Sequence, residues 1–441
     1  MAKTSSMTKC WLAPSDDLTQ AAKACISFMP AKNFHVRQAA VSALRAWAKG
    51  QDYAESLIER HASRRQLNSS DRKLLQAILY SVLRNRNLLD HWIGKLRKGR
   101  LDPETRDVLR VGLCQTLLLG LPDHAAVNET VEAGKAAVRG LINAVLRRSI
   151  SIREELLAEI DSLPQPIAHS HPEWLFKRWK NAYGKDAALE LMKWNNQPST
   201  TSFRVNPLVP ESEGDLPGAA INGADGFYQL EGSLPRDLLA NGSLYIQDSA
   251  TRHCVELLDP KAGEAVLDSC AAPGGKAFLI AAAMGSAATL TCTDSNTKRL
   301  PRLRENLERL HMGEAKVEQH DWTEPAPNEW HHAFDAILLD VPCSNTGVIR
   351  RRVDVRWRLK PLDIETIRET QLKILENSLP CLRPGGRIVY STCSIEDGEN
   401  RDLVREFLEN HPEIELTNDR RILPFEHHSD GAYAARLERK T

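Results

Sequence analysis

The stretch "EAVLDSCAAPGGKAFLIAAAMG", Glu264–Gly285, decides the fold class of the chain. It places a short apolar strand before a glycine turn and an apolar helix, and the alternation continues downstream. Strand patterns follow at "ATLTCTD", "AKVEQHD", "FDAILLD" and "GRIVYST", with helical patterns at "TKRLPRLRENLERLH" and "DIETIRETQLKILENSLPCL" between them. This alternation predicts a doubly wound, mostly parallel α/β sheet of the Rossmann-like type, in which ligands bind at the carboxyl ends of the strands.

The turn after the first strand is suited to a ligand. Gly274 and Gly275 let the backbone turn tightly, and the following helix offers free N–H groups. A Walker loop would need glycine at position 270 and Ser or Thr at position 277, where the chain has Cys270 and Ala277. The dinucleotide fingerprint G-x-G-x-x-G is also absent. Taken alone, an ordinary tight turn explains these glycines equally well.

Three acids close successive strands: Asp294, Asp321 and Asp340. Asp294 can accept hydrogen bonds from both ribose hydroxyls of a nucleoside. Each acid by itself is also explained as a helix cap. Together with the glycine turn they predict an adenosine pocket without a pyrophosphate site, which fits S-adenosylmethionine better than NAD or ATP.

Two cysteines, Cys343 and Cys393, follow the fourth and fifth strands. Those strands are neighbours in a doubly wound sheet, so both thiols are expected to face one crevice. The alternative, a small buried hydrophobe, is the interpretation that we apply to Cys114, Cys254, Cys292 and Cys381. No two cysteines are three apart and their count of nine is odd, so neither a zinc site nor a disulfide framework is predicted.

A thiol pair beside a carboxylate matches the needs of cytosine C5 methylation. C5 becomes a nucleophile only after a thiolate adds to C6. A base must then remove the C5 proton, and an acid near N3 balances charge on the ring. The residues alone leave open which thiol attacks.

Four motifs occur in the region from Ser243 to the C-terminus: "LDSCAAPGGK", "TDSNTKRL", "LLDVPCSNTGVIRR" and "LRPGGRIVYSTCSIEDGEN". They occur in the same order as in the RNA cytosine-C5 methyltransferases, the family that this region resembles. The segment "DGAYAARL" resembles the closing strand of the family. The resemblance implies that Cys393 attacks C6 and that Cys343 assists release, with Asp340 and Lys276 as further catalytic residues. It also implies cofactor contacts by Cys270, Ala271, Ala272, Pro273, Gly274, Gly275, Lys276, Asp294, Asp321 and Asp340.

The chain departs from that family at several positions. Asn345 stands where glycine is usual, and Arg352-Val353 stands where His-Pro is usual. Ala277 replaces a common Thr, Asp397-Gly398 is an unusual version of its loop, and Ala432 replaces an aromatic. None of these changes removes a catalytic group.

The region before the methyltransferase motifs is helical in pattern. "DPETRDVLRVGLCQTLLLG" has Pro103 at a first helical position behind a capping Asp102, and "SSDRKLLQAILY" offers Ser69, Ser70 and Asp71 as caps. The segments "DRKLLQAILYSVLRNRNLLDHWI" and "LRVGLCQTLLLGLPDHAAVNETVEAGKAAVRGLINAVLRR" resemble the RNA-binding fold of the NusB family, and the fusion resembles the bacterial 16S rRNA cytosine-C5 methyltransferases. We therefore expect a disordered extension (1–33), a NusB-like all-α bundle (34–165), a small α+β module (171–242) and the methyltransferase domain (243–441).

The formal net charge is zero, so contact with RNA must come from local basic patches. Lys and Arg gather at Gly94–Arg100, in "VLRRSISIR" and at Val348–Lys360. A solvated helix face explains the first two equally well, whereas Arg350 and Arg351, beside the crevice, are expected to contact RNA. Small-subunit rRNA is the expected partner. The alternatives are a tRNA substrate and a non-catalytic RNA-binding assembly factor.

Composition is ordinary for a globular protein, with 42% hydrophobic and 26% charged residues. No apolar run approaches the ~20 residues that a bilayer requires, and the N-terminus lacks the apolar core of a signal peptide. We expect a cytoplasmic monomer with reduced thiols, no membrane association and no metal.

Overall fold

The computed structural model describes residues 34–50, 52–209 and 216–440. The chain divides into two compact units, Met1–Asn196 and Gln197–Thr441. The expected extension, residues 1–33, lies outside the described residues.

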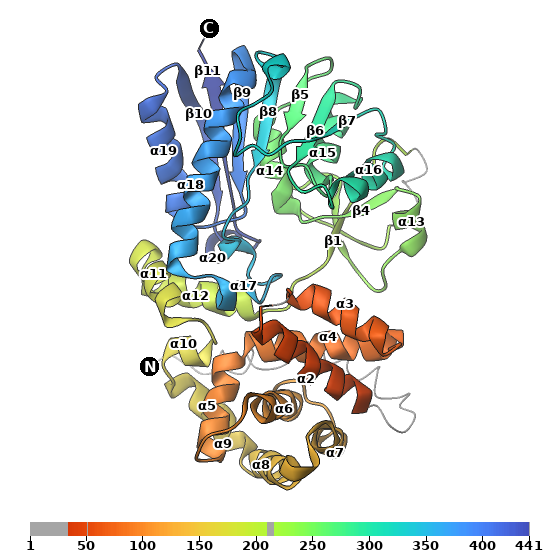
Figure 1. The fold of residues 1–441 in the computed structure, drawn as a ribbon, viewed down its shortest axis with the longest axis vertical. Coiled ribbons are helices and arrows are strands. Elements are labelled where there is room, and N and C mark those ends of the chain that lie inside the picture. Colours follow the sequence, from red (N-terminus) through yellow and green to blue (C-terminus); the bar gives the residue numbers. More distant parts are fainter. Residues whose placement is uncertain (1–33, 51, 210–215, 441) are drawn as a thin grey trace, which may run out of the picture. The chain divides into compact units, whose positions relative to one another are not determined.

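The first unit is helical in its described residues (Figure 1). Its α-helices are α2 (Phe34–Ala48), α3 (Ala54–Arg64), α4 (Ser69–Arg84), α5 (Arg86–Leu96), α6 (Pro103–Leu113), α7 (Asp123–Ala133), α8 (Arg139–Ser151), α9 (Arg153–Ala158), α10 (Gln165–Ala168), α11 (Glu173–Tyr183) and α12 (Lys185–Asn196). Asp102 caps α6 as expected, because its Oδ1 accepts from the Glu104 and Thr105 amides at 3.1 and 3.0 Å. Helix α4 is instead capped by Asn68, one residue before the expected caps.

The second unit begins with a four-stranded antiparallel sheet in the order β2-β3-β1-β4. The strands are β1 (Ser202–Val205), β2 (Gly218–Ala220), β3 (Phe227–Leu230) and β4 (Leu244–Ile246), and the short helix α13 (Arg236–Ala240) precedes β4. The small sheet thus extends past the expected limit of its module at residue 242. Helices α11 and α12, expected in the same module, belong to the first unit.

The large sheet has seven strands in the order β10-β11-β9-β8-β5-β6-β7 (Figure 1). The strands are β5 (Val266–Asp268), β6 (Leu290–Asp294), β7 (Lys316–Gln319), β8 (Phe334–Asp340), β9 (Leu382–Thr392), β10 (Ile414–Ile422) and β11 (Ala432–Arg439). Strands β5 to β9 pair in parallel, and β10 and β11 add an antiparallel edge. The expected mostly parallel sheet is therefore confirmed.

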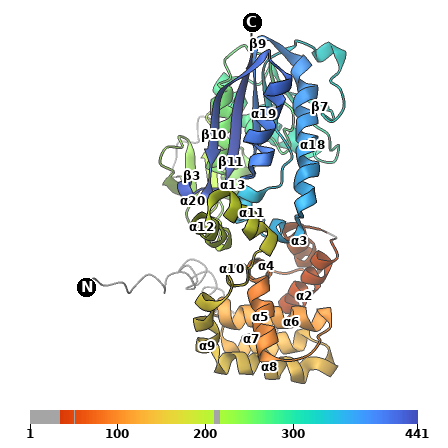
Figure 2. The same cartoon turned by 90° about the vertical axis from the view of Figure 1, so that its left-hand side faces the viewer.

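Helices cover both faces of this sheet. They are α14 (Arg252–Leu258), α15 (Gly275–Met284), α16 (Leu300–Arg309), α18 (Pro361–Ser378) and α19 (Arg401–Asn410). The short helices α17 (Val355–Arg358) and α20 (Pro424–His427) contribute no residue to the two cores on these faces. One hydrophobic core lies on each face of the sheet, and successive residues of β8 point into different cores. Leu338 packs in the core formed with α14, α15 and α16, and Ile337 packs in the core formed with α18 and α19. Figure 2 shows α18 and α19 on one side of β10 and β11. The strand ends where ligands bind are thereby held between two packed layers.

Within the described residues, no helix is long and apolar enough to cross a membrane.

Candidate active site

Two sulfur atoms meet at the ends of neighbouring strands. Cys343 follows β8 and Cys393 follows β9, and Asp340 pairs in register with Ser391. The two Sγ atoms are 3.1 Å apart. The two thiols therefore lie together, as expected, although only Cys393 lines the adjoining cavity.

The loop after β8 turns at Asn345, which has a φ of 59°. This left-handed region is favourable for glycine and is next most accessible to Asn and Asp. The departure from the usual glycine is therefore compatible with the backbone. Asn345 also reaches both cysteines: its Nδ2 donates to the Cys343 carbonyl at 2.7 Å, and its Oδ1 accepts from the Cys393 thiol at 3.3 Å.

The hydrogen bond between the thiols separates their acidities. With Cys343 donating, this bond lowers the pKa of Cys393 and raises the pKa of Cys343 well above its ordinary value. Burial and the negative charge of Asp340 oppose the lowered pKa of Cys393, whereas the positive charges of Arg352 and Lys276 support it. Cys393 is thus the thiol that ionises first, and a thiolate is the nucleophilic form of cysteine.

A partly buried ion pair lies beside the thiols. Lys276, in the first turn of α15, donates to Asp340 Oδ2 at 2.7 Å, and the two side chains are 18% and 31% exposed. Burial disfavours the ammonium, but the Asp340 carboxylate raises the pKa of Lys276 above its ordinary value. Lys276 therefore stays protonated at neutral pH, and Asp340 Oδ1 is left to accept further hydrogen bonds at the cavity.

A cavity of about 300 Å³ opens at these residues. It is lined by Lys276, Asp340, Asn345 and Cys393. The other lining residues come from α14 and the segment before it, from the loop after β8, and from strands β9 to β11 with their loops. They are Asp248, Ala250, Thr251, His253, Cys254, Val348, Arg351, Arg352, Ser391, Thr392, Arg420, Ile422, Asp430, Gly431, Ala432, Tyr433 and Ala434. The lining thus combines residues that follow the parallel strands β8 and β9 with residues of the antiparallel strands β10 and β11. The sulfur atom of Cys393 faces this partly open cavity.

The glycine turn is held from several directions. Gly274 has a φ of 104°, which strains any residue with a side chain, and a Cβ there would also crowd Leu303 Cδ1 at 3.1 Å. Asn306 donates to the Pro273 carbonyl at 2.8 Å. Arg204 of β1 donates to the Gly275 carbonyl at 3.0 Å while its guanidinium stacks on Phe278. The turn that opens α15 is therefore rigid and leaves its helix N–H groups available.

The acids expected to hold the adenosine end lie at adjacent strand ends. Asp294 ends β6, is 3% exposed and accepts from the Asn296 amide at 2.9 Å. Asp321 is exposed and lies just beyond β7, which ends at Gln319 rather than at the acid itself. Both remain candidates for ribose and base contacts, and Asp340 is placed nearer to the cysteines.

Sequence reasoning missed Asp268, the last residue of β5. It is fully buried, and neither carboxylate oxygen has a partner in hydrogen-bond geometry among the described residues. Burial, followed by the negative charge of Asp340, raises the pKa of Asp268 to about 7. The sequence could have indicated Asp268, because it is an acid at the end of a predicted strand, which is the feature that identified Asp294, Asp321 and Asp340.

The two arginines expected to contact RNA are paired within the protein. Arg351 donates to Asp430, to Asp248 and to the Thr200 carbonyl, the last at 2.7 Å. Arg350 is 7% exposed and faces Asp430 at 3.4 Å. The next residue, Arg352, is exposed, lines the cavity and has no side-chain hydrogen bond or ion pair within the described part of the chain.

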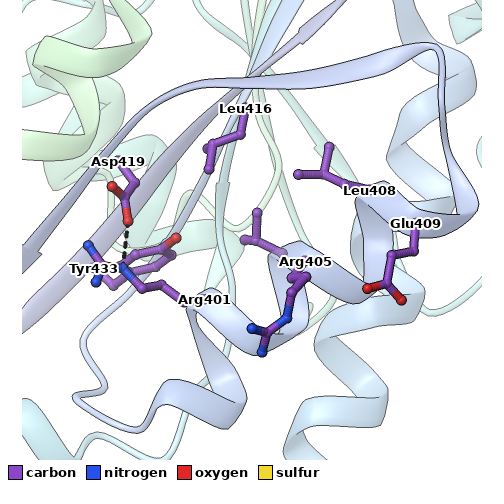
Figure 3. Close-up of a pocket in the computed structure, with 8 residues that line it drawn as sticks. Arg401, Arg405, Leu408, Glu409, Leu416, Asp419 and Tyr433 are labelled. Atoms are coloured by element: carbon purple, nitrogen blue, oxygen red, sulfur yellow. Dashed lines mark hydrogen bonds and ion pairs between the residues drawn. The ribbon is translucent and has the colours of Figure 1, made fainter.

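A second hollow, of about 540 Å³, lies between α19 and β10 (Figure 3). Figure 3 shows Arg401 paired with Asp419 beside Tyr433, and the bond measures 2.8 Å. It is open to solvent, and Tyr433 also lines the cavity beside Cys393. None of the expected site residues lines it, so size alone does not locate the active site.

Among the described residues, no group of three or more His, Cys, Asp or Glu side chains could hold a metal ion.

Three family models match the chain. The model described as 16S rRNA methyltransferase RsmB/F matches residues 255–438, and the NusB family model matches residues 35–151. The ferredoxin-like domain of the RsmF/B-like methyltransferases matches residues 171–213. These ranges follow the sheet, the helical unit and the connecting region.

Relatives of known name match almost the whole chain. A probable ribosomal RNA small subunit methyltransferase B of Bacillus subtilis is 32% identical over 87% of this chain and 90% of its own length. A ribosomal RNA small subunit methyltransferase B of Cronobacter sakazakii is 35% identical over 85% of this chain and 92% of its own length. The crystal structure of a methyltransferase homologue from Pyrococcus horikoshii is 26% identical, with a TM-score of 0.53, covering 64% of this chain and 99% of its own. With the glycine turn, the paired thiols and matches over most of its length, this chain belongs to the ribosomal RNA small subunit methyltransferase B family.

Proposed function

We propose that the protein is an S-adenosylmethionine-dependent methyltransferase that modifies C5 of a cytosine in 16S rRNA through a covalent Cys393–C6 adduct. The observation that carries the proposal is the thiol pair, 3.1 Å apart, beside the Lys276–Asp340 ion pair. The names of the relatives support rRNA as the substrate. A binding factor without catalysis would need neither thiol.

The first step is addition by Cys393. Its lowered pKa supplies the thiolate, which bonds to C6 while the electron pair of the C5–C6 double bond moves toward C5. Asp340, held by Lys276, is placed to balance charge on the pyrimidine edge. S-adenosylmethionine, when bound, supplies the methyl group that C5 takes.

The second step is release. Once Cys393 is a thioether, it no longer accepts the hydrogen bond that keeps the pKa of Cys343 high. Cys343 then ionises more readily and takes the C5 proton. The electrons of the C5–H bond restore the double bond and expel the Cys393 thiolate.

The residues at the strand ends fit the cofactor. The backbone at Gly274 has a φ of 104°, which favours glycine, and the free N–H groups of α15 that follow the turn favour a carboxylate. In this proposal Asp294 orients the ribose, Asp321 contacts the base, and the turn from Cys270 to Lys276 contacts the rest of the cofactor. A cationic ligand beside the turn would favour the ionised form of Asp268, whose pKa of about 7 leaves it partly protonated without one.

Loss of the gene should unmask one cytosine in 16S rRNA. A 5-methylcytosine resists bisulfite deamination, so this position reads as cytosine in the parent strain and as uracil in the deletion strain. Bisulfite sequencing of both rRNA and tRNA is the measurement, with a strain complemented by Cys393→Ala as the control. A change confined to tRNA would replace the rRNA assignment with the tRNA alternative. No change in either RNA would remove the proposed function.

We move the proposed RNA contact from Arg350 and Arg351 to Arg352. The first two guanidinium groups already pair with Asp430 or Asp248, so they shape the cavity wall. Arg352 has its charge available at the cavity and replaces a residue that is usually His in the family. We also propose that the helical unit presents RNA and that the enzyme acts as a cytoplasmic monomer.

Arg352→Gln should weaken RNA binding about 3- to 10-fold, because one phosphate contact is lost. The slope of the logarithm of the binding constant against the logarithm of the salt concentration should also decrease in magnitude by about one. Fluorescence anisotropy of a labelled 16S rRNA fragment over a salt series measures both. Arg383→Gln is the control, since this arginine is paired with Asp335 at the opposite end of β9. Arg352→His should restore binding near pH 6 and lose it near pH 8, because imidazole titrates at about 6.5. Equal salt slopes in the two glutamine variants would contradict the assignment.

A further inference from the structure

One carboxylate holds the residues that follow both cysteines. Glu399, in the loop after β9, is fully buried. Its Oε1 accepts from the Ser344 amide at 2.8 Å, and its Oε2 accepts from the Ser344 and Ser394 hydroxyls. Ser344 directly follows Cys343 and Ser394 directly follows Cys393. The same side chain is therefore bonded to both cysteine loops.

Neighbouring polar groups complete the network. Gln371 of α18 donates to Glu399 Oε1 at 3.0 Å and to the Pro342 carbonyl at 2.9 Å. Tyr390 donates to the Glu399 carbonyl at 2.6 Å, which fixes the backbone of the glutamate against β9. Asn400, next in the chain, binds the Thr392 hydroxyl and the Ser394 carbonyl on either side of Cys393.

Burial of this carboxylate is costly, so its role needs an explanation. Burial raises the pKa of Glu399, and the hydrogen bonds from Ser344, Ser394 and Gln371 oppose that rise. A buried carboxylate persists only when its oxygens are fully used. Here four donors use both oxygens, and three of them belong to the residues adjoining the cysteines.

We propose that Glu399 is the positioning residue that sets the separation and relative orientation of the Cys343 and Cys393 sulfur atoms. The inference deepens the proposed function and rests on it for the consequence in catalysis. The geometric claim itself concerns only the protein. Because attack and release need both sulfurs on the same pyrimidine, loosening this network disturbs both steps, and a displacement of about 1 Å in a reacting group can cost on the order of 100-fold in rate.

Glu399→Gln tests the geometric claim without RNA. The amide nitrogen cannot accept, so two of the four donors lose their acceptor whichever way the amide is turned. Diamide oxidises the two thiols to a disulfide and is itself reduced to the hydrazine. Loss of the Glu399 charge also lowers the pKa of Cys343, so the rates are compared over a pH series at equal thiolate fraction, where they depend on the Sγ–Sγ separation. Mass spectrometry of the linked Cys343–Cys393 peptides should show disulfide formation slowed about 10-fold or more. An unchanged rate in Glu399→Gln would overturn the proposal.

The catalytic consequence is measured separately. Single-turnover methylation by Glu399→Gln should fall about 10- to 100-fold, with affinity for S-adenosylmethionine within about two-fold of the parent protein. Glu264→Gln is the matched control, because this carboxylate pairs with Arg387 away from the cysteine loops. A slowed disulfide with unchanged methylation would refute the role in catalysis. Loss of methylation in every variant including the control would count against the assay rather than for Glu399.

A second variant with a smaller change tests the proposal in case Glu399→Gln does not fold. The Ser344→Ala and Ser394→Ala double variant removes both hydroxyl donors and keeps the carboxylate, the Ser344 amide and Gln371 in place. It should slow disulfide formation in the same direction by a smaller factor. A double variant that matched the parent in both disulfide and methylation rates would overturn the proposal even if Glu399→Gln did not fold.

Discussion

Replacing Cys393 with alanine should abolish methylation, with a loss of at least about 10³-fold, because no other thiol in the site is poised to add to C6. Transfer of a labelled methyl group from S-adenosylmethionine to a 16S rRNA transcript measures the loss. Covalent RNA–protein adduct should disappear as well. Affinity for S-adenosylmethionine should stay close to that of the parent protein, because Cys393 follows β9 and is not part of the glycine turn after β5, which is proposed to bind the cofactor.

The control for Cys393→Ala is Cys381→Ala. Cys381 is fully buried and precedes β9 at the end of the strand away from the cavity. This variant removes a sulfur without touching the site and should keep its activity. Adduct that persisted in Cys393→Ala would mean that a different nucleophile attacks.

Replacing Cys343 with alanine should have the opposite effect on the adduct. Addition by Cys393 proceeds, but the group that takes the C5 proton is gone, so the thioether is not broken. Radiolabelled RNA should migrate with the protein on a denaturing gel in close to one-to-one amount, and turnover should stop after about one methyl transfer per enzyme.

The double variant Cys343→Ala with Cys393→Ala should form no adduct. This result distinguishes a thioether at Cys393 from a non-specific crosslink. Adduct in Cys393→Ala together with none in Cys343→Ala would reverse the two roles. The lowered pKa of Cys393 and the raised pKa of Cys343 predict that Cys393 attacks first and that Cys343 acts in release.

Much of the fold could be predicted because its signals are local. The strand–turn–helix period after Glu264, the glycine turn and the cap at Asp102 depend on residues close together in sequence, and each is found in the structure. The pairing of Cys343 with Cys393 was predictable for a related reason, since parallel strands that are neighbours end at the same edge. Strand β10 was not predicted, and β7 ends before Asp321.

The errors and omissions share a cause. Arg350 and Arg351 have the sequence appearance of a basic patch, but their charges are used by Asp430 and Asp248, from segments far away in the chain. Glu399 looks like one more acid in a loop, and only packing shows that it is buried beneath two cysteine loops. No local pattern encodes such partners.

The sequence by itself determined the order of helices and strands, the place of the cofactor turn and the ends of the strands on which the thiols stand. Tertiary structure decided the 3.1 Å separation of the sulfurs, the partner of each arginine and the burial of Asp268 and Glu399. The reason is physical. Backbone period and turn chemistry act over a few residues, whereas acidity, charge pairing and sulfur geometry depend on which distant side chains the folded sheet brings into contact.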